Sequence, residues 1–251
     1  MTATRPIPTR CRHRPEPKSA PFNSGWHLVR RLALLHTSDV PLALFPSREE
    51  RQHIAVLRRH SLISGGKGQV VRMHALTNLV LRKCLMDEYK SEGLAAVLGS
   101  LGKGMAPFER TDTHSFKVGR QYAFHVNTAL SHVDWPISEF PGGPVAALAA
   151  SLLGFQAADF FAFVACLFPD ALALYLRTLD ILLAVRGKQH LHVAWVYSAM
   201  AHVHYQQGRF DESLTLFEES EAALPCVDTS DKEIRTGALP AQPPWAKRWF
   251  L

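Results

Sequence analysis

The sequence predicts a mainly α-helical protein that contains one small β-hairpin. Its 251 residues are 47% hydrophobic and 20% charged, which is the usage of a globular chain able to bury a core. From 145 to 224 the apolar residues recur at helical spacing, with breaks near Gly187 and Gly208. Upstream, two strand-like segments flank the turn Gly65-Gly66-Lys67-Gly68. The length fits two compact domains of about 100–150 residues each.

Residues 1–25 form a basic, proline-rich tail with a net charge of +4, whereas the whole chain carries +6. The basic character is therefore largely a property of the tail, and it is weak evidence that the folded part binds nucleic acid. The tail lacks the apolar stretch of a secretory signal, and its five prolines oppose the amphipathic helix of a transit peptide. We predict that the tail is disordered. Its charged residues are Arg5, Arg10, Arg12, Arg14, Glu16 and Lys18.

Cysteine usage favours a reducing compartment, and we predict a cytoplasmic protein. The cysteines lie far apart and form no CxxC pair, so neither a cysteine zinc site nor a disulfide scaffold is expected. The most apolar stretch, 145–168, contains Ser151, Gln156 and Asp159, which would be costly in lipid, so we expect buried helices rather than a membrane span. The cysteines are Cys11, Cys84, Cys166 and Cys226.

Residues 26–90 contain three helix-like segments, then a hairpin, then a further helix. In the first helix, Leu28, Leu32 and Leu35 fall on one face. This order predicts a winged helix-turn-helix module with an extra carboxy-terminal helix. The amphipathic pattern of that last helix is marked by Leu76, Leu79, Val80, Lys83 and Cys84. The expected helices are 26–36, 40–45, 48–60 and 74–89, and the expected strands are 61–64 and 69–73.

Residues 91–144 are predicted to form a helical connector. Glycines and Pro107 punctuate its first part, 116–133 is helix-like, and Asp134-Trp135-Pro136 stops that helix. The segment Pro141-Gly142-Gly143-Pro144 is typical of a linker. We predict helical hairpins over 145–225 and a disordered tail over 226–251. The residues of this tail that could dock on the folded part are Trp245, Trp249 and Phe250.

The helical region contains an internal repeat at an offset of 42 residues. The matched pairs are Phe168 and Phe210, Ala171 and Ser213, Leu172 and Leu214, Leu174 and Leu216, and Tyr175 and Phe217. In the second unit, Tyr197-x2-Met200-Ala201 takes the place of W-x2-L-G, and Gly208 ends the first helix. Pro225 closes the unit. This pattern predicts tetratricopeptide-like α-hairpins.

The spacing of the second unit has a physical reason. Small residues at Ala201 and Ser213 allow two antiparallel helices to approach closely, while His204 and Ser220 depart from the usual pattern. Each such repeat buries one face on a neighbour. We therefore expect that helices within 92–165 complete the packing, or that the chain is a fragment of a longer protein.

Two sequence segments of the repeat region resemble the 42-residue repeats of kinesin light chains. They run over 179–194 and 205–214. The same repeat type ends many signalling NTPases of the STAND (NB-ARC-like) group, in which a winged helix and a connector come first. The segments of this chain that resemble the winged helix and connector of that group are Asp39-Val-Pro-Leu-Ala-Leu-Phe45, residues 57–63, residues 73–82, and Phe124-His125-Val126. The resemblance covers residues 28–224. It implies that this chain is similar to the C-terminal part of such a protein.

The nucleotide-binding module of that group is absent from this sequence. No GxxxxGK[ST] motif occurs, and Lys67 is followed by Gly68 instead of Ser or Thr. A hairpin turn is the simpler interpretation of 65–68. We therefore expect neither a cofactor nor ATPase activity. The chain is expected to be a fragment of such a protein, or a truncated or degenerate form of one. Ser198 and Ala199 also stand where family repeats often place two asparagines, which weakens the expectation of a peptide clamp.

The remaining polar residues do not predict an enzyme. His202 and His204 would point about 200° apart on a helix, so they cannot share one metal ion. His190 lies where the family's repeat loop has a histidine, and with His192 it forms a second HxH pair. No GxSxG or HExxH motif occurs, and the acidic residues of 211–221 are typical of a solvated face.

We therefore predict a non-catalytic module that binds another protein through the repeat surface. By repeat register, the candidate partner-binding residues are Trp195, Ser198, His202 and Tyr205. Packing against a neighbouring repeat is the alternative role for these side chains. A protein partner of this kind is expected to bind with weak salt dependence.

DNA binding by the winged helix is the alternative function. The helix 48–60 would enter a major groove with Arg51, Arg58, Arg59 and His60, and Lys67 would lie on the wing. Glu49 and Glu50 oppose this, because they occupy the end of the helix that usually meets bases. In the resembling group, this module holds the NTPase in register. DNA binding would show a steep salt dependence.

Overall fold

The computed structural model describes residues 22–65, 69–105, 112–133 and 139–224. Predictions on residues 1–21, Lys67, Pro107, 134–136 and 225–251 fall outside this range, as does the prediction on the side chain of Cys84. The first helix begins at Phe22, inside the segment predicted as a disordered tail.

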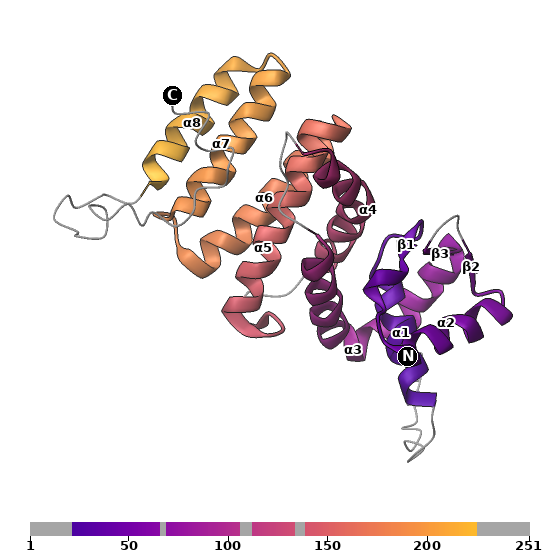
Figure 1. Cartoon of the computed structure of the whole chain (residues 1–251). Helices are drawn as coiled ribbons and strands as arrows, with labels where there is room; N and C mark the ends of the chain where they lie inside the picture. Colours follow the sequence, from indigo (N-terminus) through magenta and orange to yellow (C-terminus); the bar gives the residue numbers. More distant parts are fainter. Residues whose placement is uncertain (1–21, 66–68, 106–111, 134–138, 225–251) are drawn as a thin grey trace, which may run out of the picture.

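The described elements run from a small sheet at one end to helical hairpins at the other (Figure 1). The sheet end comprises α1 (Phe22–Ala33), β1 (Val40–Pro41), the 3₁₀ turn η1 (Leu42–Leu44), α2 (Arg48–Arg59), β2 (Ile63–Gly65) and β3 (Val70–Met73). Next come α3 (Ala75–Gly104) and α4 (Thr113–Leu130). The hairpin end comprises α5 (Gly143–Phe160), the π-helical turn η3 (Phe161–Ala165), α6 (Phe168–Arg186), α7 (Leu191–Gln206) and α8 (Phe210–Ala223). The predicted mainly α-helical class is confirmed.

The three strands form an antiparallel sheet in the order β1-β3-β2. Val40 pairs with Val71, and Ile63 pairs with Met73. The helix predicted over 40–45 is wrong, because the β-branched Val40 and the following proline pair with β3 instead. Only the single 3₁₀ turn η1 remains of it.

Helix α3 is longer than the sequence predicts, since it continues through 90 to Gly104. The glycines expected to punctuate the connector lie inside it. A side chain at Gly93 would come within 3.2 Å of Leu34, and one at Gly104 within 2.8 Å of Tyr122. At these two positions the missing side chain allows close helix contacts, so glycine serves packing rather than a turn.

The core-facing side of α3 also differs from the prediction. Leu76, Leu79 and Val80 are at least half exposed, whereas Asn78 is buried. The side-chain nitrogen of Asn78 donates to the carbonyl of Ala33 at 3.3 Å, and Nε of Arg82 donates to the same oxygen at 2.8 Å. These polar side chains satisfy the free carbonyls at the end of α1, which turns the apolar residues outward.

The repeat region consists of two antiparallel hairpins, α5 with α6 and α7 with α8. The predicted breaks at Gly187 and Gly208 are confirmed, and both residues have left-handed φ values, of +77° and +75°. The break after η3, where Cys166 has a φ of +54°, was not predicted. Helices α6 and α8 begin 42 residues apart, at Phe168 and Phe210, as the internal repeat requires.

The segment Gly143–Ala165, which is α5 with η3, is the one stretch of the described residues long and apolar enough to cross a membrane. Of its most apolar window, 61% is buried inside the protein. Two of its polar residues are also satisfied internally: the Ser151 hydroxyl donates to the Leu148 carbonyl at 2.7 Å, and Asp159 accepts from Tyr175. These are the features of a core helix.

Candidate interaction surface on the helical repeats

Helix α7 carries the four predicted binding residues and contains no Asp, Glu, Lys or Arg. It begins at the cap residue His190, whose Nδ1 accepts a hydrogen bond from the backbone nitrogen of His192 at 3.1 Å. It ends two residues before Gly208. The start and the end of α7 are therefore both fixed by local chemistry.

One side of α7 is buried and the other is not. The buried side consists of Val193, Ala194, Val196, Ala199, Met200, Ala201 and Val203. On the other side, Trp195, Ser198 and His202 are half-buried, and Tyr205 is 57% exposed. The structure thus brings the four predicted residues onto one face of a single helix.

Aromatic neighbours surround this face. The ring of His202 lies 5.3 Å from that of Phe163 in η3, and it stacks on Tyr205 at 6.4 Å. Tyr205 in turn meets the edge of Phe210 at 5.5 Å. We call Phe163, Trp195, Ser198, His202 and Tyr205 the α7 face.

The α7 face combines packing with exposure. His202 packs on Phe163 of the preceding hairpin, which is the contact expected of a residue buried between repeats. The side-chain nitrogen of Gln206 donates to Nε2 of His202 at 2.9 Å, because an amide nitrogen cannot accept. His202 is therefore held in one orientation, while Tyr205 beside it is open to solvent.

Sequence reasoning missed Phe163. The signal was present, since Phe163 and Tyr205 are separated by the repeat offset of 42 residues. The π-helical turn η3 extends α5 far enough to carry Phe163 to His202.

The two histidines at the start of α7 contact each other and a neighbouring side chain. The rings of His190 and His192 lie 5.0 Å apart, and His192 contacts Trp195 at 4.9 Å. Burial lowers the pKa of both histidines, and the nearby Arg186 lowers the pKa further. Among the described residues, no three His, Cys, Asp or Glu side chains are placed to hold one metal ion.

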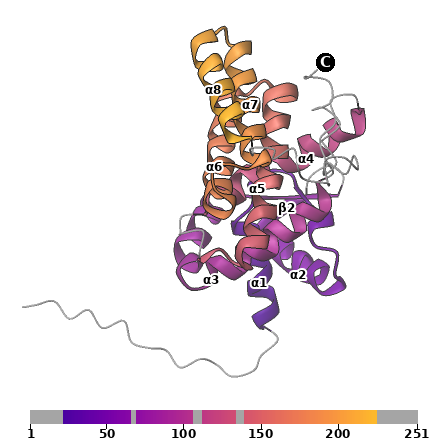
Figure 2. The same cartoon turned by 90° about the vertical axis from the view of Figure 1, so that its left-hand side faces the viewer.

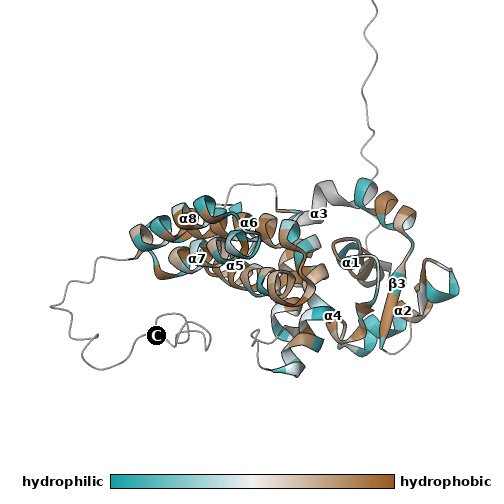
Figure 3. Cartoon of the chain, turned by 90° about the horizontal axis from the view of Figure 1, so that it is seen from above, coloured by the Kyte–Doolittle hydropathy of each residue, from teal (hydrophilic) through white to brown (hydrophobic). Residues whose placement is uncertain are grey.

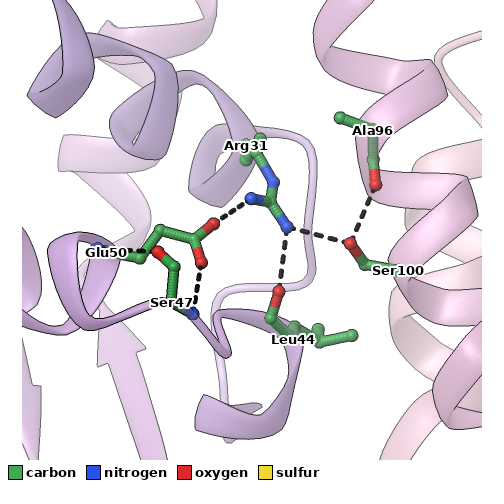
Figure 4. A network of polar contacts seen from close by, with 6 residues as sticks. All are labelled: Arg31, Leu44, Ser47, Glu50, Ala96 and Ser100. Atoms are coloured by element: carbon green, nitrogen blue, oxygen red, sulfur yellow. Dashed lines mark hydrogen bonds and ion pairs between the residues drawn. The ribbon is translucent and has the colours of Figure 1, made fainter.

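At the sheet end, Arg31 joins four elements in one polar network (Figure 4). Its guanidinium pairs with Glu50 of α2 and donates to the Leu44 carbonyl and the Ser100 hydroxyl, both at 2.9 Å. Glu50 also closes a capping box with Ser47 at the start of α2. Arg31 was not predicted, because its partners are distant in the sequence.

The basic side chains of α2 point into solvent. Arg51, Arg58 and Arg59 are exposed, as is Glu49 at the start of the helix. Glu50 is occupied by Arg31 and by Ser47, so it adds little free negative charge to this end.

Residues 148–225 match the tetratricopeptide repeat family. The match begins in α5 and includes both hairpins, so the chain contains a tetratricopeptide-repeat region. This confirms the prediction of tetratricopeptide-like α-hairpins. No match is found among curated proteins or among solved structures.

Proposed function

We propose that this chain is a non-catalytic cytoplasmic module that binds another protein through the α7 face. Tetratricopeptide repeats generally mediate protein–protein interaction, and the matched family is typically a scaffold rather than an enzyme. The observation that carries the proposal is the gathering of Trp195, His202 and Tyr205 on one accessible side of α7.

The chemistry of the α7 face selects an apolar or aromatic partner segment. Trp and Tyr bury large rings at low entropy cost and dominate many interfaces. Because α7 has no Asp, Glu, Lys or Arg, binding there would depend on apolar contact and on hydrogen bonds from Ser198 and Tyr205. Weak salt dependence follows from that composition.

We propose that the sheet end is a winged-helix module. The element order α1, β1, η1, α2, β2, β3 and the sheet order β1-β3-β2 support this. His125 of α4 lies 3.3 Å from the carbonyl of Asp39, so the helical connector contacts the sheet end directly. Descent from the C-terminal part of a STAND-type signalling NTPase is the finer form of the proposal, and it rests on the sequence resemblance.

The test is peptide selection on the purified chain, followed by titration of a selected peptide. Trp195→Ala is expected to weaken binding by at least about tenfold, because truncating an anchor residue typically costs more than 1–2 kcal/mol. Leu176→Ala, on the half-exposed face of α6, is the matched control and should leave the affinity unchanged. Equal binding by wild type and Trp195→Ala would exclude the α7 face.

A second function is favoured by the exposed arginines of α2. Arg51, Arg58 and Arg59 could meet DNA phosphates, as a winged helix would require. Duplex DNA binding measured at rising salt separates the two functions. A steep loss of affinity with salt, removed by Arg58→Ala with Arg59→Ala, would support DNA binding. Binding that is lost only with the basic residues of 1–25 would be nonspecific.

A further inference from the structure

One side of α8 carries a line of exposed apolar residues. Phe210 and Leu214 are 62% and 61% exposed, and Phe217 and Leu224 are both 41% exposed. The spacing of four and three places Phe210, Leu214 and Phe217 on one side of the helix, and Leu224 is the residue at which the helix ends. We call these four residues the α8 stripe. The neighbouring side of α8, with Ser213 and Ala223, is buried.

The equivalent positions of α6 are covered. At the offset of 42 residues, the α8 stripe corresponds to Phe168, Leu172, Tyr175 and Leu182. Tyr175 and Leu182 are 0% and 1% exposed. Helix α6 packs between α5 and α7, whereas the helix that α8 packs on is α7. The α8 stripe is therefore less covered than its counterparts on α6.

Charge restricts what can cover the stripe. Helix α8 contains five acidic residues and no lysine or arginine. Figure 3 shows hydrophilic and hydrophobic residues alternating along it. Glu221 lies within the stripe, and Glu218 is next to it, by helical spacing. A second copy of α8 would bring like charges together, so the occupant must combine apolar with basic side chains.

This chain contains one segment of that chemistry near α8. Residues 245–251 read Trp-Ala-Lys-Arg-Trp-Phe-Leu, with two basic residues and no acidic one. Twenty residues, 225–244, connect it to the end of α8. They can extend up to about 65 Å, whereas α8 is about 21 Å long, so every point of the stripe is within reach. Covalent connection also gives the segment a high effective concentration.

We propose that Trp245–Leu251 docks on the α8 stripe and caps the last repeat. Trp245, Trp249 and Phe250 cover Phe217 and Leu214, while Lys247 and Arg248 pair with Glu218 and Glu221. The cap covers Leu214 and Phe217 and not Phe210, whose ring borders Tyr205 of the α7 face at 5.5 Å. This inference therefore does not depend on the proposed function.

The first test is zero-length carbodiimide cross-linking of the full chain, read by mass spectrometry of the monomer fraction. The expected cross-links join Lys247 to Glu218 or Glu221. Cross-links to Glu212 or Glu219, on the far side of α8, at equal frequency would overturn the proposal. Cross-links found only in a dimer fraction would also overturn it and would favour a second copy of the chain.

The second test is backbone hydrogen exchange of α8 in the full chain. Trp245→Ala with Trp249→Ala should speed the exchange of α8 by about threefold or more and leave α3 unchanged. Glu218→Lys with Glu221→Lys should have the same effect. The control, Glu219→Lys, makes the same kind of charge change on the far side, outside the first turn of α8, and should not. If neither substituted pair alters α8 exchange, the stripe is free for another protein and the proposal is wrong.

Discussion

The hydroxyl of Tyr175 donates a hydrogen bond to the carboxylate of Asp159, with 2.5 Å between the two oxygens. Tyr175 is fully buried, and Asp159 is 5% exposed. The pair joins α5 to α6. At the repeat offset, the same two positions of the second hairpin hold Ala201 and Phe217. The two equivalent positions therefore hold a polar pair in the α5–α6 hairpin and an apolar pair in the α7–α8 hairpin.

Tyr175→Phe should therefore destabilise the repeat region. Removing the hydroxyl takes a hydrogen bond from a buried carboxylate, which costs roughly 1.5–3 kcal/mol of unfolding free energy. Tyr205→Phe is the matched control, because its ring is 57% exposed. Chemical denaturation followed by circular dichroism measures both. Equal stabilities of the two variants would contradict the role of the pair.

The same relationship explains what the sequence could predict of the repeats. Helices α6 and α8 share a visible pattern of residues at the offset of 42, and the break before α8, at Gly208, was predicted, whereas the break before α6 was not. The repeat pattern cannot be recognised in α5, the first helix of the first hairpin, because Asp159 occupies the place of a small residue. A carboxylate there is tolerated only with the Tyr175 hydroxyl beside it, and that contact is visible only in three dimensions.

Two more equivalent residues, Ser220 and Thr178, differ in hydrogen bonding. The Ser220 hydroxyl donates to the Ala194 carbonyl at 2.8 Å and so links α8 to α7. The Thr178 hydroxyl is buried and has no hydrogen-bond partner among the described residues.

Opposite stability changes are expected at these two positions. Ser220→Ala should lower the unfolding free energy by about 1 kcal/mol, through loss of the hydrogen bond. Thr178→Val should leave it unchanged or raise it by up to about 1 kcal/mol, since an unpaired buried hydroxyl is replaced by a methyl of similar shape. Thermal melting of both variants checks the signs, and a large loss in Thr178→Val would show that its hydroxyl is satisfied.

Arg31 and Arg72 each make an ion pair, and the two pairs should differ in importance. The side chains of Arg31 and Glu50 are 16% and 20% exposed, whereas those of Arg72 and Asp39 are 53% and 56% exposed. Arg31→Met should cost roughly 2–4 kcal/mol, because Glu50 and the Leu44 carbonyl lose their partner in a partly buried site. Arg72→Met should cost less than about 1 kcal/mol. Denaturant titration compares them, and equal losses would contradict the network (Figure 4).

Some residues of the structure could be predicted from the sequence, and some contacts could not. Trp195, Ser198, His202 and Tyr205 follow from repeat register alone, since they share one helix face. Contacts between distant segments, such as Arg31 with Ser100, have no local signature. The α7–α8 hairpin and the sheet end lie at opposite ends of the molecule (Figure 2), so each needs its own experimental test.

The junction of these two ends contains a buried histidine, His125 of α4. Its Nε2 lies 3.3 Å from the carbonyl of Asp39, and because a carbonyl can only accept, the proton is on Nε2. Nδ1 is buried without a partner among the described residues. Burial lowers the pKa of His125 to about 4; the Asp39 carbonyl opposes this shift and the nearby His36 adds to it.

His125 should make the protein less stable as the pH falls from 6.5 to 4. In this range the unfolded chain binds a proton on this residue and the folded chain does not, so stability is fully present above pH 6.5 and is lost toward pH 4. The loss from His125 is about 3 kcal/mol in all. His125→Gln removes the proton uptake, so its unfolding free energy should change less with pH than that of the wild type, whatever its stability at pH 7. His114→Gln, at an exposed position of α4, should keep the wild-type slope. If His125→Gln has the same slope as the wild type over this range, His125 is not the group whose burial makes the folded state acid-sensitive.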